Sequence, residues 1–101
     1  MPASIPALLS FPSEAARQDA WGRLINLWSS GAKLLTQTRL SRGEKLFLSL
    51  ELGGERFESV PGTVSAVEID ADGYCLAELA FSDALARGRL AKALIGALAR
   101  S

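Results

Sequence analysis

The chain has 101 residues, a length typical of one domain that buries a single hydrophobic core without disulfide or metal staples. Apolar residues make up 49% of the sequence and charged residues 22%, which argues against wholesale disorder. The 11 basic and 11 acidic residues give a formal net charge of zero. We therefore expect no DNA or RNA partner, because nucleic-acid-binding proteins gain affinity mainly by neutralising phosphates.

The first predicted strand covers residues 5–11, with Pro6 inside it and Pro2 and Pro12 beside it. Because proline cannot donate to a strand ladder, we expect an edge strand or an extended arm. Residues 13–20 are polar and alanine-rich, a composition compatible with a helical turn capped by Ser13 or with a hairpin loop.

The second predicted strand runs from Trp21 to Leu27. Strict alternation places one set of its side chains on one face: Trp21, Arg23, Ile25 and Leu27. The sequence Ser29-Ser30-Gly31 predicts a turn, since glycine tolerates positive φ and serine hydroxyls satisfy turn amides. A third strand is expected over 32–36, followed by a polar loop over 38–43.

The clearest strand pattern covers 45–52, in which four leucines share one face. Gly53-Gly54 predicts a type I′ hairpin. We expect the return strand from Glu55 to be interrupted at Pro61-Gly62 and to resume over 63–69, because proline removes a ladder donor.

Asp70-Ala71-Asp72-Gly73 predicts the next hairpin turn. Its D-x-D-G string is similar to the start of a calcium loop, but no later ligands follow at the required spacing. The last predicted strand covers 74–81. Its expected inner face carries four residues: Cys75, Ala77, Leu79 and Phe81.

Ser82-Asp83 is expected to cap a helix that ends near Ala99. Its apolar stripe has spacing four and is widened by neighbouring apolar residues: Ala86, Leu90, Leu94 and Leu98, with Ala91, Ile95 and Ala97. The pattern predicts a mostly β fold, a small six-stranded antiparallel barrel over about 5–81 with a C-terminal α-helix over about 83–99. The helix is expected to pack on the open face or mouth of the sheet.

Charges are sorted along the chain. Residues 51–78 contain seven acidic side chains against the single Arg56, whereas 83–101 contain four basic side chains against the single Asp83. This pattern is typical of a solvated acidic sheet face and a basic helix. We also considered self-association or weak membrane contact through the helix.

Catalytic groups are scarce. The chain contains no histidine, and its single cysteine, Cys75, has no base partner in view. We therefore expect neither an enzyme nor a resident metal or cofactor. The lone cysteine favours a reducing compartment, and the N-terminus shows neither a signal peptide nor a membrane-spanning run, so a cytoplasmic protein without a transmembrane segment is expected.

The sequence from Gly22 to Thr36, followed by Leu40 to Leu46, resembles the PilZ domain family. In that family a strand leads into a [D/N]-x-S-x-x-G turn, and a strand, a loop ending in glycine and an alternating leucine strand follow. Pro61 to Val67 and Gly73 to Phe81 are similar to later segments of the family. The resemblance spans most of the chain and implies a split-barrel type of six-stranded barrel with a C-terminal helix.

The resemblance also implies the bacterial second messenger cyclic di-GMP as the family ligand, held by the turn and by an N-terminal R-x-x-x-R element. Asn26 occupies the first motif position and Gly31 the last, whereas Trp28 stands where the family has serine. The R-x-x-x-R element is missing, since no arginine precedes Arg17.

Three interpretations follow. The first is a non-catalytic adaptor that contacts a protein partner, by analogy with degenerate family members in type IV pilus assembly and motility, with weak or no nucleotide binding. The second is a genuine cyclic di-GMP receptor. The third is a purely structural or self-associating barrel. The predicted site residues are Arg23, Asn26, Trp28, Ser29 and Gly31. An exposed Trp28 favours a partner site, because tryptophan is enriched among interface hot spots, and a buried Trp28 favours the structural interpretation.

Overall fold

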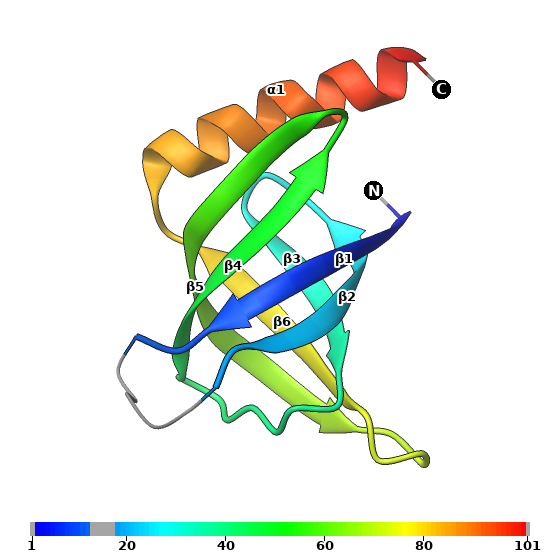
Figure 1. Cartoon of the computed structure of the whole chain (residues 1–101), viewed down its shortest axis with the longest axis vertical. Coiled ribbons are helices and arrows are strands. Elements are labelled where there is room, and N and C mark those ends of the chain that lie inside the picture. The colour runs from blue at the N-terminus through cyan, green and yellow to red at the C-terminus, as the bar shows by residue number, and fades with distance from the viewer. Residues whose placement is uncertain (1, 13–17, 101) are drawn as a thin grey trace.

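The computed structural model describes the backbone of residues 2–12 and 18–100, and the side chains of 4–12 and 18–97. Six antiparallel strands close into a barrel in the order β1-β2-β3-β6-β5-β4, and one helix follows (Figure 1). The elements are β1 (Pro2–Ser10), β2 (Ala20–Leu27), β3 (Gly31–Thr36), β4 (Lys45–Leu52), β5 (Glu55–Ile69), β6 (Cys75–Phe81) and α1 (Ala84–Arg100). The predicted fold class is therefore confirmed. The proposed helical cap at Ser13 lies outside the described residues.

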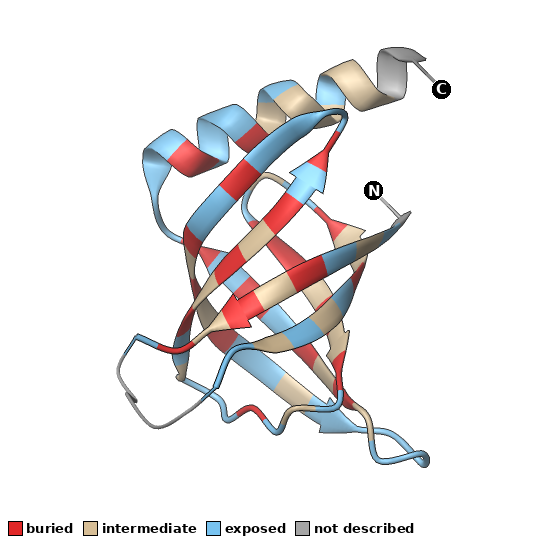
Figure 2. Ribbon diagram, viewed as in Figure 1, coloured by how far each residue is buried: buried red, intermediate tan, exposed pale blue. Residues whose placement is uncertain are grey.

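The side chains that the period-2 pattern of the strands points inward are buried and form the core. Figure 2 shows buried residues alternating with more exposed ones along the strands. The alternation is cleanest in β4 and β6, where every second residue is buried. These residues are Leu46, Leu48, Leu50 and Leu52, with Cys75, Ala77, Leu79 and Phe81. Both predicted inner faces are confirmed.

Strand β1 is not an edge strand, contrary to the prediction. It pairs with β2 along most of its length and with β4 over Ala7 to Ser10. Pro2 and Pro6 lie in the part of β1 that has β2 as its only partner strand, so their missing N–H groups remove no bond to β4. The prolines are compatible with a closed barrel because β1 and β4 separate before Ala7.

Strand β2 contains a bulge that the strict alternation missed. The register against β3 shifts between Leu24 and Asn26, and Ile25 is the extra residue. Leu24 and Leu27 are both fully buried as a result. Leu27 therefore does not share a face with Trp21, which is exposed.

Strand β5 is continuous, so the predicted interruption at Pro61-Gly62 is wrong. One irregularity lies earlier, where Glu58 and Ser59 together oppose Ser49 on β4, and another lies later, where the register against β6 shifts between Val64 and Ala66. Ser59 has a φ of 54°, and its N–H donates to the Ser49 hydroxyl over 3.1 Å. Pro61 fits because β6 ends opposite Gly62, which leaves Pro61 with a neighbouring strand on the β4 side only.

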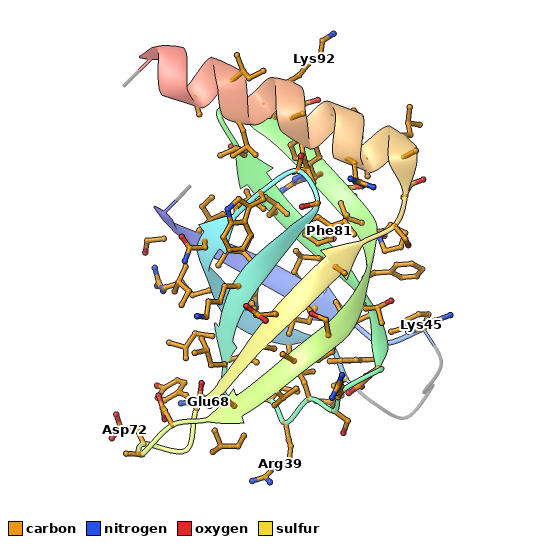
Figure 3. All side chains as sticks on the ribbon, turned by 180° about the vertical axis from the view of Figure 1, so that it is seen from behind. Arg39, Lys45, Glu68, Asp72, Phe81 and Lys92 are labelled. Atoms are coloured by element: carbon orange, nitrogen blue, oxygen red, sulfur yellow. The ribbon has the colours of Figure 1, made fainter. Side chains whose placement is uncertain are left out.

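The two predicted hairpin turns are present. Gly53 and Gly54 both have positive φ, 59° and 82°, as a type I′ turn requires. At the second turn the Asp70 carboxylate accepts hydrogen bonds from the backbone N–H groups of Asp72 and Tyr74, each over 2.9 Å. The acidic end of this hairpin lies at the opposite end of the barrel from α1, as the positions of Asp72 and Lys92 show (Figure 3).

Helix α1 lies across one end of the barrel beside the β4–β5 hairpin (Figure 1). Asp83 caps it, because its carboxylate accepts from the N–H of Ala86 over 3.2 Å. Ala86 and Leu90 are buried against the barrel, as predicted. Ile95 does not widen this stripe, since it is 68% exposed, and the Leu98 side chain lies outside the described part of the chain.

The Arg89 guanidinium connects α1 to the start of β5. It donates to the Glu55 carboxylate over 3.1 Å and to the backbone carbonyl of Arg56 over 3.3 Å. Its central carbon lies 4.8 Å from the centroid of the buried Phe57 ring. One side chain thus contributes an ion pair, a hydrogen bond and a cation–π contact to the helix–barrel junction.

Candidate functional site

The corner between β2 and β3 consists of Trp28, Ser29 and Ser30, and hydrogen bonds hold its backbone in place. The Trp28 N–H donates to the carbonyl of Gly31 over 2.8 Å, which closes the turn. The N–H of Phe81, at the end of β6, donates to the carbonyl of Ser30 over 2.9 Å. The corner is therefore fixed by its own turn and by a neighbouring strand.

Gly31 is buried, and its backbone passes so close to β6 that a Cβ atom there would collide with the backbone carbonyl oxygen of Leu79. Its φ is not in the left-handed region, so the predicted need for positive φ is wrong. Close approach between strands requires the glycine instead. Packing alone thus accounts for the last position of the motif.

Asn26 points to the outer surface of the barrel, because its neighbour Leu27 is fully buried and adjacent strand residues face opposite ways. The bulge at Ile25 places Arg23 on the same outer face. Arg23 donates from Nη1 to the hydroxyl of Ser4 over 2.7 Å. Lys33 pairs with Asn26 across β2 and β3, which adds a second cation beside the corner.

Trp28 is 44% exposed, and Ser29 is half-buried beside it. The five predicted residues thus divide into two groups. Arg23, Asn26, Trp28 and the half-buried Ser29 reach the surface, whereas Gly31 serves the packing of β3 against β6. The structure brings the outer-facing residues to one end of β2.

Cys75, the single thiol of the chain, is 1% exposed inside the barrel. Within residues 2–12 and 18–100 no three His, Cys, Asp or Glu side chains are placed to hold a metal ion together. The same described residues include no helix with the length and apolar character needed to cross a bilayer.

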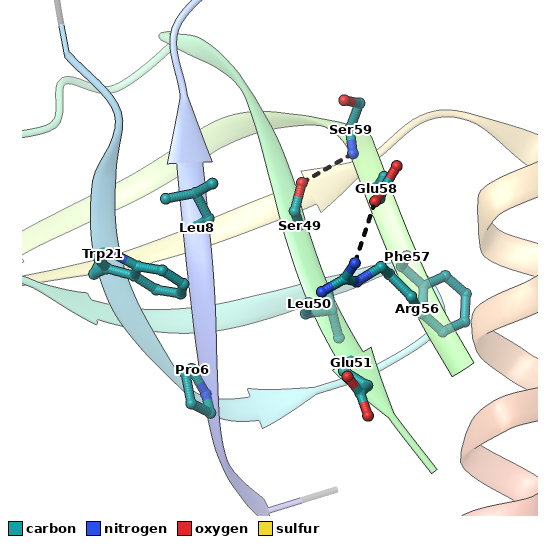
Figure 4. Close-up of a pocket in the computed structure, with 10 residues that line it drawn as sticks. All are labelled: Pro6, Leu8, Trp21, Ser49, Leu50, Glu51, Arg56, Phe57, Glu58 and Ser59. Carbon is teal, nitrogen blue, oxygen red and sulfur yellow. Dashed lines mark hydrogen bonds and ion pairs between the residues drawn. The ribbon is translucent and has the colours of Figure 1, made fainter. Parts of the chain in front are cut away.

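A second surface feature, which the sequence did not predict, is a groove of about 470 Å³ on the outside of β2, β1, β4 and β5 (Figure 4). We call it the Trp21 groove. One side is lined by Pro6, Leu8 and Trp21, and the other by Glu51, Arg56 and Glu58. The exposure of Trp21, at 68%, is the clearest sign of it.

Comparison with known proteins gave no relative: the chain matches no protein-family model and no curated protein.

Proposed function

We propose that this protein is a non-catalytic, PilZ-like regulatory or adaptor domain of bacterial cyclic di-GMP signalling, which acts in the cytoplasm through protein–protein contacts at the β2–β3 corner. The observation that carries the proposal is the exposure of Trp28, 44% on a corner whose backbone is held by two hydrogen bonds. A rigid, partly exposed tryptophan offers a large contact area at a low entropic cost to binding.

The fold supports the family assignment within this proposal. The closed six-stranded antiparallel barrel with one C-terminal helix is the architecture that the resemblance implies. Because one fold hosts many functions, the barrel alone does not identify the ligand. The functional part of the proposal rests on the corner.

The corner is poorly equipped to hold the dinucleotide. Each missing arginine contact to a phosphate or a guanine removes about 1.5–3 kcal/mol. Two or more such losses weaken a micromolar site to the millimolar range, since every 1.4 kcal/mol or so is tenfold in affinity. Asn26 faces outward and can still contribute, but Gly31 is explained by its contact with Leu79 and adds no support for a ligand.

Two measurements test the proposal. Isothermal titration with cyclic di-GMP is expected to show no heat of binding, and low-micromolar binding would favour the receptor interpretation. Capture of bacterial type IV pilus or motility proteins on immobilised protein is expected to be lost in Trp28→Ala. Ile69→Ala, which removes an exposed apolar side chain at the end of β5, away from the corner, is the matched control for this readout. Retention of the same partners by Trp28→Ala contradicts a partner site at the corner.

Self-association is a second candidate, which the outer face of α1 favours. Leu85 and Ile95 are 76% and 68% exposed, although both are large and apolar. Sedimentation of the wild type and of Leu85→Glu/Ile95→Glu distinguishes the two candidates. A wild-type dimer that is absent in the double variant supports self-association. A wild type that stays monomeric at all concentrations excludes it.

A further inference from the structure

The Trp21 groove exists because two neighbouring strands separate. Strands β1 and β4 pair only between Ala7↔Leu50 and Ser10↔Phe47. Before Ala7, β1 pairs with β2 alone, and after Leu50, β4 pairs with β5 alone. The divergence opens the outer surface between the two strand pairs, over a floor that includes the buried Leu50 and Phe57.

The two sides of the groove differ in chemistry. On the β2–β1 side, Trp21 lies opposite Leu8 in the register, and Pro6 is the next outward residue of β1. On the β4–β5 side, Glu51 lies opposite Arg56, and Glu58 follows on β5. Figure 4 shows Trp21 on one side of β1 and β4, and Arg56 and Glu58 on the other. The groove therefore has an apolar side and a charged side.

The charged side carries a net negative charge and is free to rearrange. Two carboxylates, Glu51 and Glu58, stand against the single guanidinium of Arg56. The Arg56–Glu58 pair is long, at 3.8 Å, with side chains that are 73% and 71% exposed. An exposed pair of this kind contributes little stability, so an incoming cation can replace Arg56 at small cost. The face of Trp21 also attracts cations, arginine above all.

Local backbone strain occurs at the same place. Ser59 lines the groove with a left-handed φ of 54°, held by the hydrogen bond from its N–H to the Ser49 hydroxyl. Such conformations cost free energy in a non-glycine residue and are concentrated at ligand-binding sites. The bulge moves Glu58 and Ser59 out of the regular ladder beside Ser49.

We propose that the Trp21 groove binds an extended basic peptide segment of a protein partner, with apolar side chains against Trp21, Leu8 and Pro6 and a lysine or arginine between Glu51 and Glu58. An extended chain presents alternate side chains to opposite sides, which matches the two sides of the groove. Charge complementarity selects a basic segment over an acidic one. This inference rests on the proposed adaptor function and supplies the chemistry of the partner.

The test uses a blocked peptide, acetyl-Leu-Arg-Leu-Arg-Leu-amide, titrated into the Trp28→Phe protein, in which Trp21 is the only tryptophan. We expect a saturable change of Trp21 fluorescence. The basic peptide is expected to bind about tenfold or more tightly than a control peptide with glutamate in place of each arginine. A peptide of the same composition without alternation, Leu-Leu-Leu-Arg-Arg, is expected to bind more weakly. Equal binding of all three peptides, or no saturation at millimolar concentration, overturns the proposal.

Matched variants locate the binding. Glu51→Gln/Glu58→Gln is expected to weaken the basic peptide about fivefold or more, whereas Glu68→Gln/Glu78→Gln removes two exposed carboxylates elsewhere on β5 and β6 and leaves the affinity unchanged. Equal effects of the two double variants contradict a site in the groove. Partner capture by Trp28→Ala is scored separately. If Trp28→Ala loses the captured partner and the peptide does not bind the groove, this inference is overturned and the proposed function is kept. If Trp28→Ala keeps the captured partner and the peptide binds, the proposed function is overturned.

Discussion

Gly31 lies directly against the backbone carbonyl of Leu79, where β3 and β6 approach too closely for any side chain. The pair belongs to the inter-strand register in which Gly31 faces Ala80 and Ala32 faces Leu79. The contact holds the end of the β2–β3 corner against β6, next to the bond between Phe81 and Ser30. The geometry of the corner thus depends on a buried glycine that packs against the neighbouring strand.

Replacing Gly31 by alanine is expected to destabilise the protein by about 1–3 kcal/mol or more, because backbone must move to admit the methyl group. Gly88→Ala is the matched control, since a Cβ at Gly88 meets nothing within 4 Å. That change in α1 is expected to stabilise by about 1 kcal/mol, the difference in helix propensity. Urea unfolding of both variants measures the effects, and equal shifts in the same direction contradict the packing explanation.

Most of the fold was predictable because period-2 alternation records burial directly. The leucines of β4 and the inner face of β6 illustrate this, as does the pair Gly53-Gly54, whose turn type is encoded by two adjacent residues. The bulges at Ile25 and at Glu58-Ser59 were not predictable, because a bulge depends on the register of a distant partner strand. No local residue pattern marked either one.

The candidate site was predictable in part. The motif placed Asn26 and Gly31 at one corner, but only the structure shows that Gly31 is required by Leu79 and that Trp28 is exposed. The Trp21 groove arises where the pairing of β1 with β4, which closes the barrel, ends at Ala7 and Leu50. Strand patterns alone carry no information about such a separation.

Arg89 is expected to contribute measurably to stability at the helix–barrel junction. Arg89→Ala removes a cation–π contact worth about 0.5–2 kcal/mol and an exposed ion pair worth at most about 1 kcal/mol. We expect a loss of about 1–2 kcal/mol by urea unfolding. Arg87→Ala, an exposed arginine of the same helix, is expected to stay within about 0.5 kcal/mol of the wild type. Equal losses for both arginines would show that Arg89 acts only through its charge.

The strained backbone at Ser59 in β5 predicts different effects on stability for two substitutions. Ser59→Val is expected to destabilise by about 1–3 kcal/mol, because a β-branched residue is poorly tolerated at a φ of 54°. Ser59→Gly relieves that strain but lowers the rigidity of the unfolded chain, so its expected effect lies within about 1 kcal/mol of zero. Thermal unfolding followed by circular dichroism compares the variants. A valine variant as stable as the glycine variant contradicts a strained bulge.

Trp28→Ser introduces the serine that the proposed [D/N]-x-S-x-x-G turn would have at this position, so it tests one half of the proposed nucleotide site without the other. One hydrogen bond contributes about 0.5–1.5 kcal/mol, which corresponds to roughly tenfold in affinity at most. Because the R-x-x-x-R element stays absent, we expect titration calorimetry of Trp28→Ser with cyclic di-GMP to show no low-micromolar binding. The same variant is expected to lose the captured protein partner, since the exposed indole is gone. Tight nucleotide binding by Trp28→Ser would instead mean that Arg23 and Lys33, on the outer face beside the corner, replace the missing arginines.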